Sequence, residues 1–149
     1  LVRFRIDKDK IKEISKKLID DKLTVVIAHE TEDAERARMI AVEMNAKTQG
    51  KIGPYQFRAV AVDFYNLSKT PMSFLYILKG GDQNIKKAIA TAKTKGVVSF
   101  THRRSDIESG AVLSMDIERK TVVILNRSAM KDGGIRFVDS FYKIVRVVE

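Results

Sequence analysis

The sequence predicts an α/β protein, a three-layer α/β/α domain with a mostly parallel sheet and an antiparallel C-terminal hairpin. Short, nearly all-apolar runs, typical of strands covered on both faces, alternate along the chain with longer amphipathic segments. Such alternation is the pattern of β-α-β units, whose helices cover both faces of a parallel sheet. The chain has 149 residues and shows no internal repeat or linker, so we expect a single domain over residues 1–149.

The N-terminal part predicts two strands and two helices. Residues 1–6 alternate apolar and basic side chains, which favours a half-buried strand. The apolar residues of 8–20 recur at helical spacing among lysines and acids, which predicts an amphipathic helix. Residues 23–28 are nearly all apolar and predict a buried strand. A second helix begins near Thr31, which can cap its N-terminus, and ends before Gly50.

The middle of the chain continues the alternation. Residues 56–63, 73–78 and 97–101 are rich in β-branched and aromatic side chains and predict three further strands. Between the last two lies a helix over 82–96, which Asp82 can cap and whose apolar residues form one stripe. This part therefore supplies the central strands of the sheet and one covering helix.

The C-terminal part breaks the alternation. Residues 112–117 and 121–125 are two apolar strands joined by three polar residues, close enough for an antiparallel hairpin. Asn126 then begins a short helix, and residues 137–148 are apolar and helical or partly extended. We expect the hairpin to add an antiparallel edge to the parallel sheet.

Composition excludes several kinds of chemistry. The chain contains no Cys, which excludes disulfides, zinc–thiolate sites, iron–sulfur clusters and thiol catalysis. It has two His and no G-x-S-x-G elbow or other nucleophile motif. We therefore expect a protein that is not an enzyme and that has no cofactor and no metal.

Four side chains follow predicted strands and define a candidate ligand edge. Open α/β sheets bind ligands in the crevice outside the carboxyl ends of their strands. Two histidines at that edge could bind a metal, although no acidic residues stand near them at a diagnostic spacing. The four residues are His29, Asp63, Lys79 and His102.

Two nucleotide or phosphate interpretations of this edge fit poorly. Gly80–Gly81 lies between a strand and a helix, where Rossmann and P-loop proteins bind phosphates, but its surroundings match neither glycine-rich fingerprint. Asp82 would repel a phosphate there, so we interpret the pair as a tight turn. A phospho-receiver interpretation, with Asp63 as acceptor and Lys79 as its partner, lacks the acidic pair that would hold Mg²⁺.

A basic excess defines a candidate partner or anion patch. The chain carries 28 Lys and Arg against 19 Asp and Glu, a formal net charge of +9. The excess is concentrated between residues 79 and 104, but without the interleaved aromatics of a nucleic-acid interface. A solvated helix face explains this excess best, and an anionic partner, whether an acidic protein, a lipid headgroup or a polyanion, is the alternative. We expect no nucleic-acid partner. The patch comprises Lys86, Lys87, Lys93, Arg103 and Arg104.

Five residues of the C-terminal part form a family-like motif: Gly110, Asn126, Ala129, Gly133 and Phe141. A glycine precedes the hairpin, an asparagine begins the following helix, and a second glycine leads into an apolar tail. In this order the chain resembles the YfiR-like family of bacterial periplasmic proteins. The order of elements agrees over roughly 23–148 and the residues themselves over 110–148. We expect Asn126 to be an N-cap and both glycines to adopt positive φ.

The resemblance implies a binding and signalling module. In that family, YfiR binds the periplasmic part of an inner-membrane diguanylate cyclase and represses it, and related domains are extracytoplasmic sensors of kinases. We therefore expect a non-enzymatic periplasmic regulatory or sensor domain of cyclic-di-GMP signalling that acts by protein–protein contact, with a homodimer as one form. No export signal lies within the chain, so this localisation depends on the resemblance.

The chain also departs from that family. Residues 1–22 predict a strand and a lysine-rich helix where the family has an aromatic-rich helix ending near Trp-Pro, and the absence of cysteines excludes the family's redox switch. Two alternatives stay open: a small-ligand-binding extracytoplasmic module at the strand ends, and a basic protein associated with polyanions or nucleic acid.

Overall fold

The computed structural model describes residues 18–117, 121–137, 142–143 and 145–149. The strand expected over 1–6 and most of the helix expected over 8–20 lie outside the described residues. The strands are β1 (Lys22–His29), β2 (Lys51–Ile52), β3 (Tyr55–Asp63), β4 (Phe74–Ile77), β5 (Val98–Phe100), β6 (Leu113–Ile117), β7 (Thr121–Asn126) and β8 (Arg146–Val148). The helices are α2 (Ala34–Thr48), α3 (Asp82–Lys95) and α4 (Arg127–Asp132), with 3₁₀ turns η2 (Thr31–Asp33), η3 (Phe64–Lys69) and η4 (Arg104–Ile107).

All eight described strands form one sheet in the order β2-β3-β1-β4-β5-β6-β7-β8. Strands β3, β1, β4, β5 and β6 are parallel neighbours, and β6 and β7 form the predicted antiparallel hairpin. The mixed, mostly parallel sheet confirms the predicted α/β class. One strand was not predicted: β2 pairs with the start of β3 in a short antiparallel ribbon. In the tail that was expected to be helical or partly extended, β8 pairs in parallel with β7.

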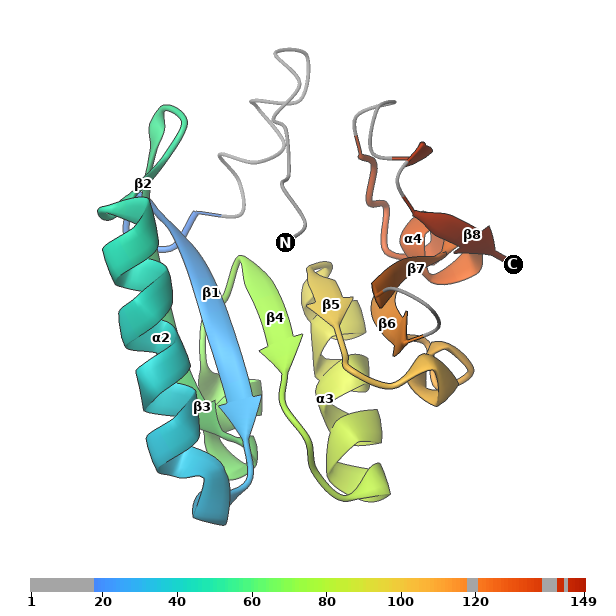
Figure 1. The fold of residues 1–149 in the computed structure, drawn as a ribbon, viewed down its shortest axis with the longest axis horizontal. Helices are drawn as coiled ribbons and strands as arrows, with labels where there is room; N and C mark the ends of the chain where they lie inside the picture. The colour runs from blue at the N-terminus through green and yellow to red at the C-terminus, as the bar shows by residue number, and fades with distance from the viewer. Residues whose placement is uncertain (1–17, 118–120, 138–141, 144) are drawn as a thin grey trace.

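Helices cover both faces of the sheet (Figure 1). Helix α2 lies on one face over β1 and β3, and α3 lies on the opposite face together with η3. The alternation along β1 explains this: Val26 and Ala28 pack into the α3 cluster, whereas Ile27 packs into the α2 cluster. Among the described helices none is long and apolar enough to cross a membrane.

A third apolar cluster lies at the C-terminal side of the sheet. The hairpin strands contribute Leu113 and Leu125, α4 contributes Met130, and Val145 and Val147 pack against them. The tail is thus extended at β8, one of the two forms expected for residues 137–148.

The topology places a switch point between β1 and β4. From β1 the chain crosses to β3 through α2 on one face, whereas from β4 it crosses to β5 through α3 on the other. The connections that leave the carboxyl ends of β1 and β4 therefore run to opposite faces of the sheet, which is where open α/β sheets form their ligand crevice.

Two predicted helix caps are wrong. Thr31 begins the 3₁₀ turn η2, and α2 begins only at Ala34, without a side-chain cap. Asp82 is the first residue of α3, whose N-cap is Gly81. In both cases an acidic side chain in the first turn, Glu35 or Asp82, complements the helix dipole from inside the helix.

Candidate functional site

The carboxyl end of β1 is closed by Glu30. Its Oε1 accepts hydrogen bonds from Gly81 N at 2.9 Å and Asn84 Nδ2 at 3.0 Å, and its Oε2 lies 3.2 Å from the same amide nitrogen. The carboxylate thus occupies the N-terminus of α3, the place where a bound anion would be expected at a switch point. The chain itself supplies the negative group.

Gly80 allows this contact. A Cβ at Gly80 would lie 2.9 Å from Phe64 Cε2, closer than real Cβ atoms approach, and 3.0 Å from Glu30 Oε1, a tight contact. A side chain at this position would therefore force the Phe64 ring and the Glu30 carboxylate to shift. This supports the interpretation of Gly80–Gly81 as a tight turn rather than a phosphate cradle.

Two residues of the candidate ligand edge, His29 and Asp63, are register neighbours at the ends of β1 and β3. Asp63 accepts hydrogen bonds from Tyr65 N at 2.8 Å and from the Thr31 hydroxyl at 2.9 Å, and these bonds hold the pKa of Asp63 below its ordinary value. His29 is buried, and its Nδ1 lies 2.7 Å from the Glu30 carbonyl oxygen, which requires the proton on Nδ1. Both side chains are engaged within the chain.

The other two residues of the edge lie in different surroundings. Lys79 is exposed beyond β4. The His102 ring packs edge-on against Tyr76 at 5.1 Å and Phe100 at 5.9 Å between ring centroids, and the latter two rings stack at 5.5 Å. Burial lowers the pKa of His102, and the Arg36 charge lowers it further, so the imidazole is neutral at pH 7.

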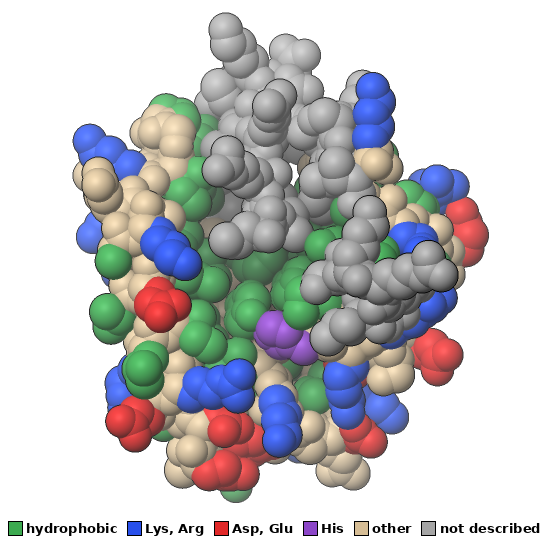
Figure 2. Space-filling view, in the orientation of Figure 1, with side chains coloured by type: hydrophobic (Ala, Val, Ile, Leu, Met, Phe, Trp, Pro, Cys, Tyr) green, Lys and Arg blue, Asp and Glu red, His purple; other side chains and the backbone are tan. Residues whose placement is uncertain are grey.

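Two of the four residues of the candidate ligand edge, His29 and Asp63, are therefore hydrogen-bonded within the chain. Lys79 is exposed, and His102 packs against aromatic rings. Among the described residues no three His, Asp or Glu side chains gather closely enough to hold a metal ion. Figure 2 shows hydrophobic side chains and one histidine in the middle of the viewed face, whereas most of the acidic side chains lie along its lower edge.

The basic patch divides into two parts. Lys86, Lys87 and Lys93 are exposed on the outward face of α3, opposite its buried apolar stripe, and Arg104 is exposed in η4. Arg103 instead forms ion pairs with Asp82 at 3.0 Å and with the buried Asp106 at 2.7 Å. Those acids raise the pKa of Arg103. The guanidinium joins the first turn of α3 to η4 and is committed within the chain.

The family-like motif has a structural role at three of its positions. Asn126 is the N-cap of α4, as predicted: its Oδ1 accepts from Ala129 N at 3.2 Å, and its Nδ2 donates to the Ile107 carbonyl at 3.0 Å. Gly110 has the predicted positive φ, at 101°. Ala129 packs at the edge of the third apolar cluster.

The prediction for Gly133 is wrong, and Phe141 lies outside the described residues. Gly133 has φ of −82°, and the left-handed residue that follows α4 is Gly134, at 65°. The helix continues through one more right-handed residue before it turns. Gly133 is still confined, because a Cβ there would lie 3.1 Å from Ile135 Cδ1 and 3.3 Å from the Ala129 carbonyl oxygen.

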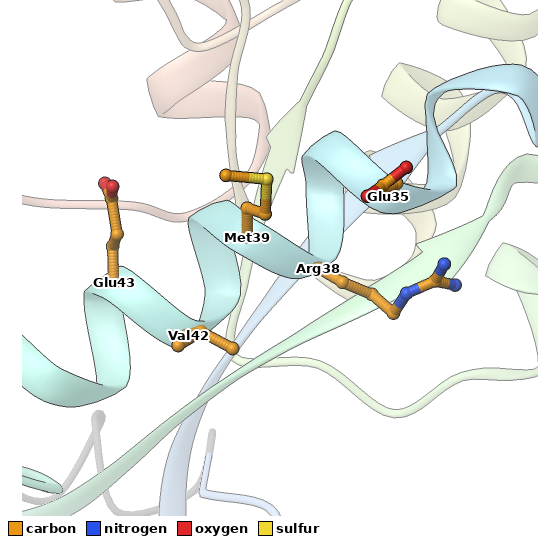
Figure 3. A pocket seen from close by; sticks show the side chains of 5 residues that line it. All are labelled: Glu35, Arg38, Met39, Val42 and Glu43. Atoms are coloured by element: carbon orange, nitrogen blue, oxygen red, sulfur yellow. The ribbon is translucent and has the colours of Figure 1, made fainter.

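Sequence reasoning missed the outward face of α2, which exposes Met39 by 62% and Val42 by 67%. These two side chains and three charged neighbours, Glu35, Arg38 and Glu43, line an open depression (Figure 3). The remaining large hydrophobic side chain that is exposed in the described part of the chain is Tyr65 of η3.

A signal for this face is present in the sequence. Ala37 and Ala41 are buried against the sheet, and Ile40 and Met44 pack beside them, so these four complete the apolar stripe of α2. Met39 and Val42 are apolar residues beyond that stripe. Apolar side chains left over after the core stripe is assigned would have identified this face.

Two solved structures share the fold. A conserved domain protein from Vibrio cholerae O1 biovar El Tor is similar with a TM-score of 0.62 and 12% sequence identity, over 95% of this chain and 60% of its own. The ABC domain from Streptococcus pneumoniae, solved in complex with L-Trp, is similar with a TM-score of 0.61 and 11% identity, over 91% of this chain and 60% of its own. The chain spans 60% of the length of each structure, and at these identities the likeness establishes the fold. No protein-family profile and no curated protein sequence matches the chain.

Proposed function

We propose that the chain is a non-enzymatic regulatory or sensor domain that acts through protein–protein contact in the periplasm. The observation that carries the proposal is the outward face of α2, where Met39 and Val42 stand exposed between charged side chains. An apolar centre with a charged rim is the usual anatomy of a protein interface.

Burial of the exposed apolar side chains of this face would contribute substantial free energy to a protein–protein contact. Fully burying a Val or Met side chain contributes about 1.5–3 kcal/mol. Single exposed hydrophobic residues are common on monomeric proteins, but Met39 and Val42 are three residues apart and therefore adjacent on the helix surface. Together they form one contiguous contact area.

The candidate ligand edge supports the same proposal, because its surroundings favour a small-ligand site less than the outward face of α2 favours a protein contact. The carboxylate of Glu30 fills the N-terminus of α3, and Asp63 and His29 bond within the chain. The helix N-terminus at which a small anionic ligand would bind is thus already occupied by a carboxylate of the chain. The periplasmic location and the type of partner, the periplasmic part of an inner-membrane signalling protein, are supported by the resemblance to the YfiR-like family.

A second candidate function is binding of an aromatic ligand. Tyr76, Phe100 and His102 form a ring cluster, and the Arg36 charge acts on both Tyr76 and His102. Aromatic rings beside a guanidinium suit an aromatic carboxylate, and the structurally similar ABC domain was solved with L-Trp. Titration calorimetry with L-Trp would support this candidate if heat is seen with the parent chain and lost with His102→Ala.

Capture from solubilised bacterial membranes tests the first proposal. We expect the immobilised chain to retain one inner-membrane signalling protein, and the Val42→Glu variant to retain at least about tenfold less, because a buried charge at the centre of the interface is costly. The matched control is Tyr65→Glu, which changes an exposed residue of η3 away from this face. Equal capture by all three chains, or recovery of only cytosolic proteins or nucleic acid, would reject the proposal.

A further inference from the structure

The outward face of α2 carries a short heptad pattern. Met39, Val42 and Ala46 are separated by three and then four residues, the spacing of a, d and a positions in a coiled coil. All three are exposed, and they lie opposite the stripe that packs on the sheet. α2 therefore has one seam for its own core and a second seam that points outward.

Charged side chains flank the outward seam at the two positions that select a partner helix. With Met39 at a and Val42 at d, Arg38 is at g and Glu43 is at e. Figure 3 shows that these two side chains leave the helix on opposite sides of the Met39 and Val42 pair. Neither Arg38 nor Glu43 forms an ion pair with another residue that the structure describes.

The spacing of these charges favours a parallel pair of identical helices. In a parallel two-stranded coil a g residue lies beside the e residue that follows it by five positions in the partner helix, and Arg38 and Glu43 are five residues apart. In an antiparallel pair g lies beside g and e beside e, so Arg38 and Glu43 would not meet. The charges of Arg38 and Glu43 are thus complementary between two copies of the helix only when the helices are parallel.

We propose that the outward face of α2 binds α2 of a second copy of this chain, with the two helices parallel about a two-fold axis. The inference goes beyond the proposed function, because a second copy and a membrane partner would compete for the same face. The symmetry pairs Met39 and Val42 with their own counterparts and forms the Arg38–Glu43 ion pair twice.

The proposed contact between the two α2 helices is short, and Glu35 restricts how far it extends towards their N-termini. α2 has 15 residues, about 22 Å of helix, so the dimer is concentration-dependent. Glu35 stands at the preceding d position, where two carboxylates would face each other. The helices therefore diverge towards their N-termini, and Glu35→Gln should increase the dimer fraction.

Disulfide trapping tests whether the two faces meet. The chain has no Cys, so a single introduced cysteine reports one contact. Val42 lies opposite its own counterpart in the proposed pair, and we expect Val42→Cys to form a covalent dimer under mild oxidation at least about tenfold faster than Tyr65→Cys. Tyr65 is the control because it is 91% exposed on η3. Equal rates for the two variants would overturn the proposal.

Charge reversal tests the orientation, with dimerisation measured by analytical ultracentrifugation of the full chain. Arg38→Glu and Glu43→Arg each replace two attractions by two repulsions, and each should weaken the dimer about tenfold. Mixing these two variants should restore a heterodimer, and the double variant should restore the homodimer. Failure of both restorations would exclude the parallel pair.

The inference and the proposed function fail separately. If the parent chain stays monomeric but Val42→Glu still loses a captured membrane partner, the second-copy inference is wrong and the proposed function stands. If the chain dimerises as described but no membrane protein is captured, the dimer is supported and the proposed function is rejected. Stability is a check on all variants, since substitutions at exposed sites without partners should change it by about 0.5 kcal/mol or less.

Discussion

The carboxyl-end edge of the sheet and the outward face of α2 differ in whether their polar side chains are bonded within the chain. At the edge, Glu30, Asp63 and Arg103 each bond to groups far apart in the sequence. On α2, Arg38 and Glu43 form no ion pair with any other described residue, and apolar side chains stand exposed between them. The difference indicates that the edge stabilises the fold, whereas the outward face of α2 leaves apolar and charged side chains available for the contact that we propose.

The edge needs its internal bonds for a physical reason. Helix N-termini leave backbone N–H groups without intrahelical partners, and α3 begins there with no side-chain cap of its own. The Glu30 carboxylate satisfies one of these groups and complements the helix dipole. A ligand at this place would have to displace a carboxylate that is covalently part of the protein.

The largest effect should follow from breaking the ion pair at η4. The Asp106 side chain is 4% exposed and accepts from Arg103 at 2.7 Å, so Asp106→Ala leaves the guanidinium with Asp82 alone. We expect a loss of about 1–3 kcal/mol in the free energy of unfolding, below the usual cost of breaking a buried pair because Arg103 is 45% exposed. Urea denaturation measures it. Asp132→Ala on the surface of α4 is the control, and an equal loss in both variants would contradict this account.

A smaller effect is expected at Glu30. Glu30→Gln replaces charge-assisted hydrogen bonds to Gly81 N and Asn84 with neutral ones, so stability should fall by about 1 kcal/mol. Glu35→Gln makes the same chemical change on the outward face of α2 and should change stability by about 0.5 kcal/mol or less. Thermal unfolding of both variants at low protein concentration compares the two regions directly. If Glu35→Gln proves the more damaging, the contrast between them is lost.

The smallest effect is a pH dependence at Asp63. Its pKa is lowered in the folded chain, chiefly by the Tyr65 N–H and next by the Thr31 hydroxyl, so the unfolded chain takes up the proton first as the pH falls. The resulting stability is present above the ordinary pKa of 3.8 and is lost as the pH falls through the lowered value. The advantage of the parent chain over Asp63→Asn should therefore be largest at pH 6, about 0.5 kcal/mol, and should shrink as the pH falls below 3.8. An advantage that is independent of pH would point to a cause other than the charge.

Much of the fold could be predicted because its signals are local. The apolar run before His29, the stripe of α3 and the Asn126 cap each depend on residues within a few positions of one another. The missed strand β2 is two residues long, and β8, whose segment was left open between helix and strand, is three, so both are too short to show a period of two. Gly133 illustrates the limit of such reasoning: two adjacent glycines could end α4, and it is Gly134 that adopts positive φ, with the Ile135 N–H bonded back to the Met130 carbonyl oxygen.

The candidate site was less predictable. Sequence placed His29, Asp63, Lys79 and His102 at one edge, and the strand ends do lie there, but position at an edge does not tell whether a side chain is free. The Glu30–Gly81 bond spans 51 residues, and the Arg103–Asp82 pair spans 21. Only the folded chain brings these groups together and shows that they satisfy one another.

By itself the sequence determined the α/β class, the hairpin, the single α3 stripe and the exclusion of thiol chemistry, because hydrophobic periodicity and composition are properties of neighbouring residues. The tertiary structure decided which polar groups remain available. A hydrogen bond between distant residues depends on sheet order and on crossover face, and the switch point placed Glu30 against α3 while it left the second seam of α2 facing outward.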